Sequence, residues 1–363
     1  GSPMRTAFAP LLLLFAALPA GAAEPLQVSI TVAPGQPLIE RMGGTQLLNF
    51  DLVVANQEAA AVDIDRVELS VFDRAGALLL RRSIDGNGVR PSIAVLGGQR
   101  IEAGQRRLLF NPFDTLAGEL DVARLDYVFE LSNADGSVRS RELVQVSPRS
   151  YRNHAAYRLP LQGRQLNHDG HDAYGHHRRF DVEFAPIQQM GFKRNAMRYS
   201  YDFVPVDASG GMFAGDFKTN ADWFGFGDDI HAIGEGVVVA VENTRPDDRQ
   251  FDQNQLASDK MVLFGNYVVI DHGGGEFGVY AHAQQGSVAV KVGDKVAQGA
   301  VVAKVGASGS ANFPHLHFQL QSGPDLDAEA LPSYFNGYSR LLGAKRVARR
   351  DASVETGEIV ETD

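Results

Sequence analysis

The 363-residue sequence contains no cysteine, which excludes a disulfide framework, a thiol nucleophile and a cysteine-ligated metal site. Any metal must therefore be held by histidine and carboxylate side chains. The sequence also lacks a His-Glu pair, so the helical HExxH motif, in which glutamate acts as the general base of many zinc proteases, is absent. If the protein hydrolyses peptides with a metal, histidine must carry the proton transfer.

Excess basic charge and long apolar runs are lacking as well. The net charge of -10 argues against a nucleic-acid-binding protein, which normally carries a basic face. The apolar run 11–15 is shorter than the ~20 residues that span a bilayer. Because it follows Arg5 and precedes small residues at 20–22, we interpret residues 1–22 as a tag remnant and a signal peptide. The mature protein is then exported, periplasmic or secreted, without an integral membrane segment.

The first half of the mature chain has a period-2 pattern. Short alternating apolar segments between residues 26 and 147 are separated by turn signals, which is typical of a β-sandwich. The clearest hairpin pairs 125–131 with 138–146 around the turn 133–136. Since this region has no histidine and no clustered carboxylates, we predict an immunoglobulin-like positioning domain at 26–147.

Histidine content rises after a predicted linker at 148–166, and nine of the ten histidines lie at or beyond His168. The pattern again predicts a strand-rich domain, at 167–343, and the polar tail 344–363 is predicted to be disordered. The strands expected from Gly234 onward are 236–241, 261–264, 267–270, 277–280, 288–291, 301–305 and 316–320. The glycine- and aromatic-rich loop 211–227 is either a groove wall or a plug of the core.

Three histidines are expected to converge in this second domain. In the segment 313–320 (FPHLHFQL), His315 and His317 alternate with apolar residues, so they should project from one strand face about 7 Å apart. His282 ends a second predicted strand upstream.

Several blocks of sequence occur in an order that resembles one known family. They are 198–203 (RYSYDF), 232–238 (AIGEGVV), 265–273 (GNYVVIDHG), 280–282 (YAH), 290–294 (VKVGD) and 314–318 (PHLHF). This set, over roughly 167–338, resembles the lysostaphin and LytM-type zinc endopeptidases, which cut the peptide part of bacterial cell wall. The resemblance implies an antiparallel β-sheet peptidase domain that binds Zn²⁺ and acts on peptidoglycan.

The resemblance also implies roles for single residues. His317 corresponds to a zinc ligand, and His315 and His282 flank the bound water as general base and transition-state stabiliser, with their individual roles left open. The family takes a histidine and an aspartate from an HxxxD strand. Here the segment 198–202 (RYSYD) keeps Asp202 but has Arg198 in place of the histidine.

Two alternatives remain for the other ligands. A literal HxxxD occurs at 177–181 and would make Asp181 the ligand, but Asp202 is favoured because it directly precedes the segment leading to the next family block. The missing histidine is then expected from the loop 168–177. We predict His177, with His176 and His171 as alternatives, so that His177, Asp202 and His317 hold the metal.

The resulting prediction is a zinc metalloendopeptidase that hydrolyses peptidoglycan cross-links or stem peptides. The alternative is a non-catalytic LytM-type wall-binding protein or amidase activator, which the loss of the usual histidine at Arg198 would suit. The retention of His282, His315 and His317 argues against that alternative. A biotinyl- or lipoyl-type carrier, suggested by the segment 290–296, lacks the Met-Lys turn that such domains modify.

Overall fold

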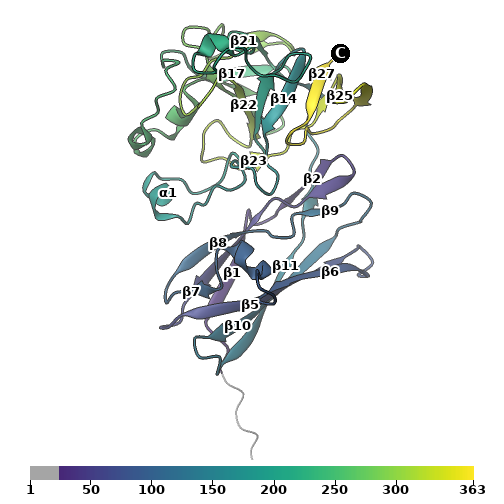
Figure 1. The fold of residues 1–363 in the computed structure, drawn as a ribbon, viewed down its shortest axis with the longest axis vertical. Helices are drawn as coiled ribbons and strands as arrows, with labels where there is room; N and C mark the ends of the chain where they lie inside the picture. The colour runs from purple at the N-terminus through teal and green to yellow at the C-terminus, as the bar shows by residue number, and fades with distance from the viewer. Residues whose placement is uncertain (1–23) are drawn as a thin grey trace, which may run out of the picture.

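The computed structural model describes residues 24–363, so the predicted signal peptide lies outside the described part of the chain. Figure 1 shows two β-rich lobes, the N-terminal one in purple and blue and the C-terminal one in teal to yellow. Within residues 24–363 the single α-helix is the one-turn α1 (Ala185–Gln189), and no helix there is long and apolar enough to cross a bilayer. The prediction of an all-β protein is confirmed.

The N-terminal lobe contains two antiparallel sheets with one apolar core between them, as in a sandwich. The first sheet is β1 (Val28–Ala33), β4 (Asp51–Asn56) and β8 (Arg106–Phe110). The second is β11 (Arg139–Val146), β10 (Arg124–Asn133), β5 (Val62–Phe72) and β6 (Leu78–Asp85), with β7 (Arg100–Ile101) beside β5. A third sheet, of four short strands, lies at the end facing the C-terminal lobe. It consists of β12 (Arg149–Ser150), β2 (Leu38–Met42), β3 (Thr45–Leu47) and β9 (Thr115–Ala117). The immunoglobulin-like assignment itself stays a prediction.

The predicted hairpin is present as β10 and β11, with Leu125 opposite Val146. Its turn contains Gly136 in the left-handed conformation that glycine adopts without steric cost. Along β10 the buried side chains alternate with more exposed ones, which places Tyr127 and Phe129 in the core.

The C-terminal lobe is built on one eleven-stranded sheet. Its path is β20 (Lys295–Val296), β17 (Gly236–Glu242), β18 (Asn266–Asp271), β19 (Phe277–Ala283), β22 (Leu316–Gln321), β15 (Tyr201–Pro205), β14 (Arg164–Asp169), β27 (Ile359–Thr362), β25 (Tyr338–Leu342) and β26 (Lys345–Arg349), with β23 (Ala330–Leu331) beside β22. The two small sheets are β13 (Tyr157–Arg158) with β24 (Phe335–Asn336) and β16 (Asp229–His231) with β21 (Val301–Lys304). The 3₁₀ turns are η1 (Ser92–Leu96), η2 (Asn220–Asp222), η3 (Gln253–Ala257) and η4 (Lys260–Phe264).

The central strands of this sheet are buried on both faces. Along β22, Leu316, Phe318 and Leu320 enter the apolar core, while the residues between them are polar and equally buried. A period-2 strand separates these two sets onto opposite faces. One face of the sheet therefore packs the core, and the other presents His317 and Gln319 to a covered polar region.

The structure corrects several boundaries expected from the sequence. The stretch 261–264 is not a strand but the 3₁₀ turn η4, and 288–291 forms no strand. The predicted linker 148–166 contains β12, β13 and the start of β14. It is held to the C-terminal lobe by the buried carboxylate of Glu276, which accepts hydrogen bonds from Tyr151 Oη at 2.8 Å and Tyr157 Oη at 2.9 Å.

The prediction that residues 344–363 are disordered is wrong. The segment supplies β26 and β27, and β27 pairs with both β14 and β25. Val354 and Val360 are fully buried in the C-terminal core. The failure has a physical reason: each of these strands has at most five residues, too few for a readable apolar period, and β14, a partner of β27, is distant in sequence.

We predict that Val360→Ala lowers the free energy of unfolding by about 2 kcal/mol, because it removes buried methyl groups and leaves a cavity. The measurement is urea unfolding of the full chain. Val292→Ala is the matched control, since Val292 is 59% exposed and its truncation should change little. Equal effects of the two substitutions would contradict the packing of β27 against the sheet.

Candidate metal centre

Asp202 lies at the middle of the polar face of the C-terminal sheet. It is in β15, directly opposite His317 in β22, and both side chains are buried. His317 Nδ1 is 3.1 Å from Asp202 Oδ1. The cross-strand pairing of two neighbouring strands therefore brings a carboxylate and an imidazole together without any contribution from a loop.

His315 and His282 lie beside this pair. His315 Nε2 is 3.3 Å from Asp202 Oδ1, and the His315 and His282 ring centroids are 4.9 Å apart. His282, in β19, has a left-handed backbone with φ of 61°, an uncommon conformation for a residue other than glycine. Its carbonyl accepts a hydrogen bond from the backbone N–H of Gly306 at 2.9 Å. Such backbone strain is typical of functional sites.

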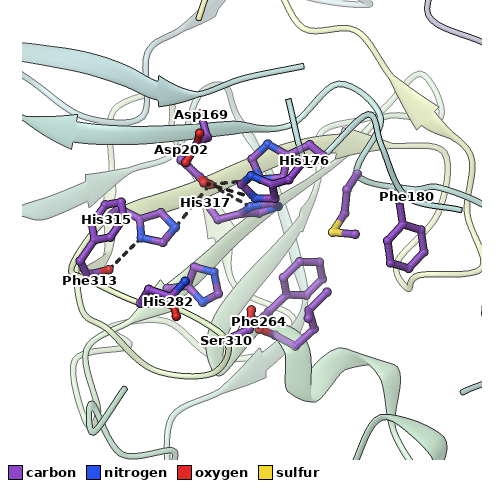
Figure 2. A pocket seen from close by; sticks show the side chains of 14 residues that line it. Asp169, His176, Phe180, Asp202, Phe264, His282, Ser310, Phe313, His315 and His317 are labelled. Atoms are coloured by element: carbon purple, nitrogen blue, oxygen red, sulfur yellow. Dashed lines mark hydrogen bonds and ion pairs between the residues drawn. The ribbon is translucent and has the colours of Figure 1, made fainter. Parts of the chain in front are cut away.

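The loop between β14 and α1 supplies two further histidines. His177 Nε2 is 3.4 Å and His176 Nε2 is 3.9 Å from the nearest Asp202 carboxylate oxygen. One ligand atom from each of these three residues lies within 4.8 Å of the others, a spacing that suits a metal ion. His177 is buried, whereas the His176 side chain is 64% exposed. Figure 2 shows these rings gathered around Asp202.

Hydrogen bonds orient three of the rings in the same way. His177 Nδ1 donates to the carbonyl of Gly170 at 2.9 Å, His282 Nδ1 to that of Ser308 at 2.8 Å, and His315 Nδ1 to that of Phe313 at 2.8 Å. A ring nitrogen that donates to a carbonyl carries the proton, so in each neutral ring Nε2 keeps its lone pair.

His317 is oriented through Gln319. The Gln319 Nε2 group donates to Ala196 O at 3.1 Å and to Gln321 Oε1 at 2.6 Å, which fixes Gln319 Oε1 as an acceptor. His317 Nε2 donates to that oxygen at 2.8 Å, and its Nδ1 faces Asp202. Four imidazoles and a carboxylate thus converge on one pocket.

The charges in the pocket shift several pKa values. Burial raises the pKa of Asp202, but His177 and His315 outweigh burial and bring it well below its usual range. Burial lowers the pKa of His315, yet Asp202 leaves it above the ordinary histidine value. Burial, with the neighbouring imidazoles, lowers the pKa of His282 well below that value and lowers that of His317. An ionised Asp202 carboxylate and a neutral His317 imidazole are the forms in which these groups bind metals.

The pocket has two different walls (Figure 2). One side has the aromatic rings of Phe180 and Phe264, and the other contains Asp169 and Phe313; Met197 and Leu263 add apolar surface to the lining. Phe313 stacks on Trp223 of the loop 211–227, with ring centroids 4.8 Å apart, so this loop supports a wall of the pocket. Among the described residues that line the pocket there is no lysine or arginine, so no fixed cation occupies the place of a metal.

The alternatives left open by the sequence are located elsewhere. Asp181 is not among the residues that line the pocket, and its carboxylate accepts the backbone N–H of Glu183 at 2.9 Å. His171 is also outside the pocket lining and contacts Glu40 of the N-terminal lobe. Arg198 points away to the same lobe, where its Nη2 is 2.8 Å from Asp51 Oδ2.

Sequence reasoning missed two residues near the metal centre. Asp169 lines the pocket, and the hydrogen bond from His168 Nδ1 at 2.8 Å lowers the pKa of its carboxyl. Gln319 was also missed, although it continues the alternation that begins at His315 and so had to share the face of His317.

Residues 217–328 match the profile described as Peptidase family M23. This range includes His282, His315 and His317, but not His177 or Asp202. For residues 217–328 this match confirms the resemblance to lysostaphin and LytM-type peptidases predicted from the sequence.

Two curated proteins match parts of the chain. The cell division protein DipM of Caulobacter vibrioides is 37% identical over 76 residues, which are 21% of this chain and 12% of DipM. The murein hydrolase activator EnvC of Escherichia coli is 29% identical over 143 residues, 36% of this chain and 34% of EnvC. The chain thus spans about an eighth and about a third of these relatives. The lysostaphin catalytic domain of Staphylococcus simulans aligns at 22% identity over 40% of this chain and 93% of that domain, with a TM-score of 0.22.

His171 gives a prediction about pH. Its Nδ1 donates to Ser200 O at 2.9 Å and its Nε2 to Glu40 Oε1 at 2.7 Å, so both nitrogens are protonated and the ring is a cation. Burial lowers the pKa of His171, but the Glu40 carboxylate and the Ser200 carbonyl raise it above its ordinary value. A raised pKa stabilises the fold at pH values below about 6.5, and this stabilisation is lost as the pH rises through the folded-state pKa.

We therefore expect His171→Gln to lower the melting temperature more at pH 6 than at pH 9, measured by thermal unfolding. His154→Gln is the control, because His154 is exposed. A loss that is the same at both pH values would show that the charge of His171 does not contribute.

Proposed function

We propose that this protein is an exported zinc metalloendopeptidase that hydrolyses peptide bonds in the cross-links or stem peptides of peptidoglycan. The observation that carries the proposal is the convergence of Asp202 with four buried imidazoles in one pocket, with ring nitrogens of His177, His315 and His317 between 3.1 and 3.4 Å from its carboxylate.

In this proposal His177 Nε2, Asp202 and His317 Nδ1 hold the zinc. Three protein ligands from histidine and carboxylate are the usual set of a catalytic zinc site. When bound, zinc acts as a Lewis acid and lowers the pKa of water. The hydrogen bonds of His177 to Gly170 and of His317 to Gln319 hold the ligand rings in place, as outer partners of zinc ligands generally do.

His315 and His282 are proposed to handle protons and stabilise the transition state. Peptide hydrolysis needs one group that takes a proton from water and delivers it to the leaving amine. Both rings are fixed through Nδ1 by backbone carbonyls, so Nε2 is the atom of each ring that can take up or deliver a proton. The exposed His176 stands at the rim of the pocket and is a weaker candidate for either role.

The peptidoglycan substrate and the export rest on other evidence. The names of two relatives support a cell-wall substrate, since EnvC is a murein hydrolase activator and DipM a cell division protein. The predicted signal peptide supports a periplasmic or secreted location. A metal pocket with one apolar wall suits a peptide with a small apolar side chain.

A second candidate is an activator of murein hydrolases without catalysis of its own. It is favoured by the match to EnvC, an activator by name, and by the replacement of the usual histidine by Arg198. His282, His315 and His317 are buried together in one pocket. This argues against the activator, which has no chemical need for such a cluster of histidines.

The proposal predicts about one zinc per mature chain by elemental analysis and the release of soluble peptides from purified murein. Chelation should abolish the release, and added zinc should restore it. A metal-free protein that binds murein and stimulates an amidase would instead establish the activator function. Activity that survives complete chelation would refute the metal mechanism.

Single substitutions separate the ligands from the proton-transfer groups. Asp202→Ala, His177→Ala and His317→Ala should each lose zinc, whereas His315→Ala should keep zinc and lose about 10²-fold or more of kcat. Asp181→Ala is the control for the literal HxxxD motif and should retain zinc. Zinc loss in Asp181→Ala with normal occupancy in Asp202→Ala would overturn the ligand assignment.

A further inference from the structure

Two of the three proposed metal ligands, His177 and Asp202, come from separate segments of the C-terminal lobe. His177 is on the loop between β14 and α1, while Asp202 is in β15. Within the lobe the loop is tied to the segment before β15 by Asn195 Nδ2, which donates to His177 O at 2.7 Å, and by the His171 ring, which contacts Ser200 O. A third connection is made by a residue of the other lobe.

That residue is Asn49, which lies between β3 and β4 and is 1% exposed. Its Nδ2 donates to Arg198 O at 2.8 Å and to His171 O at 3.4 Å, and its Oδ1 accepts from Arg178 Nε at 3.1 Å. Because carbonyls only accept and a guanidinium only donates, the Asn49 amide has one possible orientation. One side chain thus joins residues that flank His177 to a residue four positions before Asp202.

The partners of Asn49 are themselves held by the N-terminal lobe. Arg178, next to His177 in sequence, also donates through Nη2 to Asn111 O at 2.8 Å. Arg198 donates to Asp51 Oδ2 at 2.8 Å. All these groups are buried, and a buried hydrogen-bonding group that loses its partner is costly. The loop and the strand therefore cannot shift independently while the lobes remain in contact.

We propose that Asn49 is a positioning residue of the metal centre, which holds the loop bearing His177 in register with the strand bearing Asp202. This inference rests on the proposed metal site and adds a role for the N-terminal lobe in forming it. Zinc sites depend on such outer contacts, whose removal typically lowers metal affinity about 10–100-fold.

The experiment uses the full mature chain with Asn49→Ala and Asn49→Asp. Asn49→Ala removes the acceptor and both donors, whereas Asn49→Asp keeps the acceptor for Arg178 and loses the donors to the two carbonyls. Hydrogen exchange of residues 170–178 is measured in the metal-free protein, and the zinc dissociation constant by competition with a chelator. We expect faster exchange in this segment by at least about tenfold in Asn49→Ala, unchanged exchange in β18 and β19, and zinc affinity weakened about 10–100-fold, with Asn49→Asp intermediate.

Two controls separate positioning from general stability. Arg106→Ala removes an exposed ion pair with Glu183, 3.0 Å, between the same two lobes but away from Asn49, and should leave both readouts unchanged. Val67→Ala destabilises the N-terminal core. If it loosens residues 170–178 as much as Asn49→Ala does, Asn49 acts only through global stability and the proposal is wrong.

The experiment still tests the role of Asn49 if a variant does not fold or if the wild-type chain binds no zinc. Should Asn49→Ala not fold, Asn49→Asp and Arg178→Lys carry the test, since both keep part of the network. Should the wild-type chain bind no zinc, the proposed function fails, but the exchange of residues 170–178 still decides whether Asn49 positions the loop. Unchanged exchange and unchanged zinc affinity in the folded variants would overturn the inference.

Discussion

The burial of one carboxylate is the constraint on which the metal centre depends. An ionised aspartate removed from water is strongly disfavoured unless charges or hydrogen bonds compensate for the lost solvation. Asp202 is 3% exposed and has imidazole nitrogens of His177, His315 and His317 between 3.1 and 3.4 Å from its Oδ1. The need to compensate Asp202 therefore explains why histidines from a loop and a neighbouring strand meet at one point.

A second buried polar region fixes how the lobes meet. The pairs Arg198–Asp51 and His171–Glu40 are both almost fully buried, and Asp51 Oδ1 and Glu40 Oε2 have no hydrogen-bond partner among the described residues. Buried ion pairs often add little net stability compared with apolar packing, because desolvation is expensive. Their contribution here is better understood as specificity, since any other arrangement of the lobes would leave these charges unpaired. Arg198, which stands where the resemblance predicts a histidine, thus has a structural task at the junction.

The two regions connect the N-terminal lobe with the chemistry. The loop that carries His177 is bounded by His171 and Arg178, and both contact the N-terminal lobe. The proposed ligand His177 requires an ordered loop, and this order comes partly from the N-terminal lobe, which contributes none of the described residues that line the pocket. Glu276 also helps to order the segment between the lobes, because its carboxylate accepts hydrogen bonds from Tyr151 and Tyr157 and so holds that segment against the C-terminal sheet.

The sequence by itself determined the elements whose information is local. Alternation in β10 and β22 and the shared face of His315 and His317 follow from the two-residue period of a strand. The hairpin turn follows from Gly136, because glycine adopts a positive φ without steric cost. Absence of cysteine limited the metal ligands to histidine and carboxylate. Only the tertiary structure decided between Asp202 and Asp181 as neighbours of His177, gave Arg198 its partner, and placed β27 between β14 and β25. These depend on contacts between segments far apart in the chain, whose burial and pairing leave no periodic trace in the segments themselves.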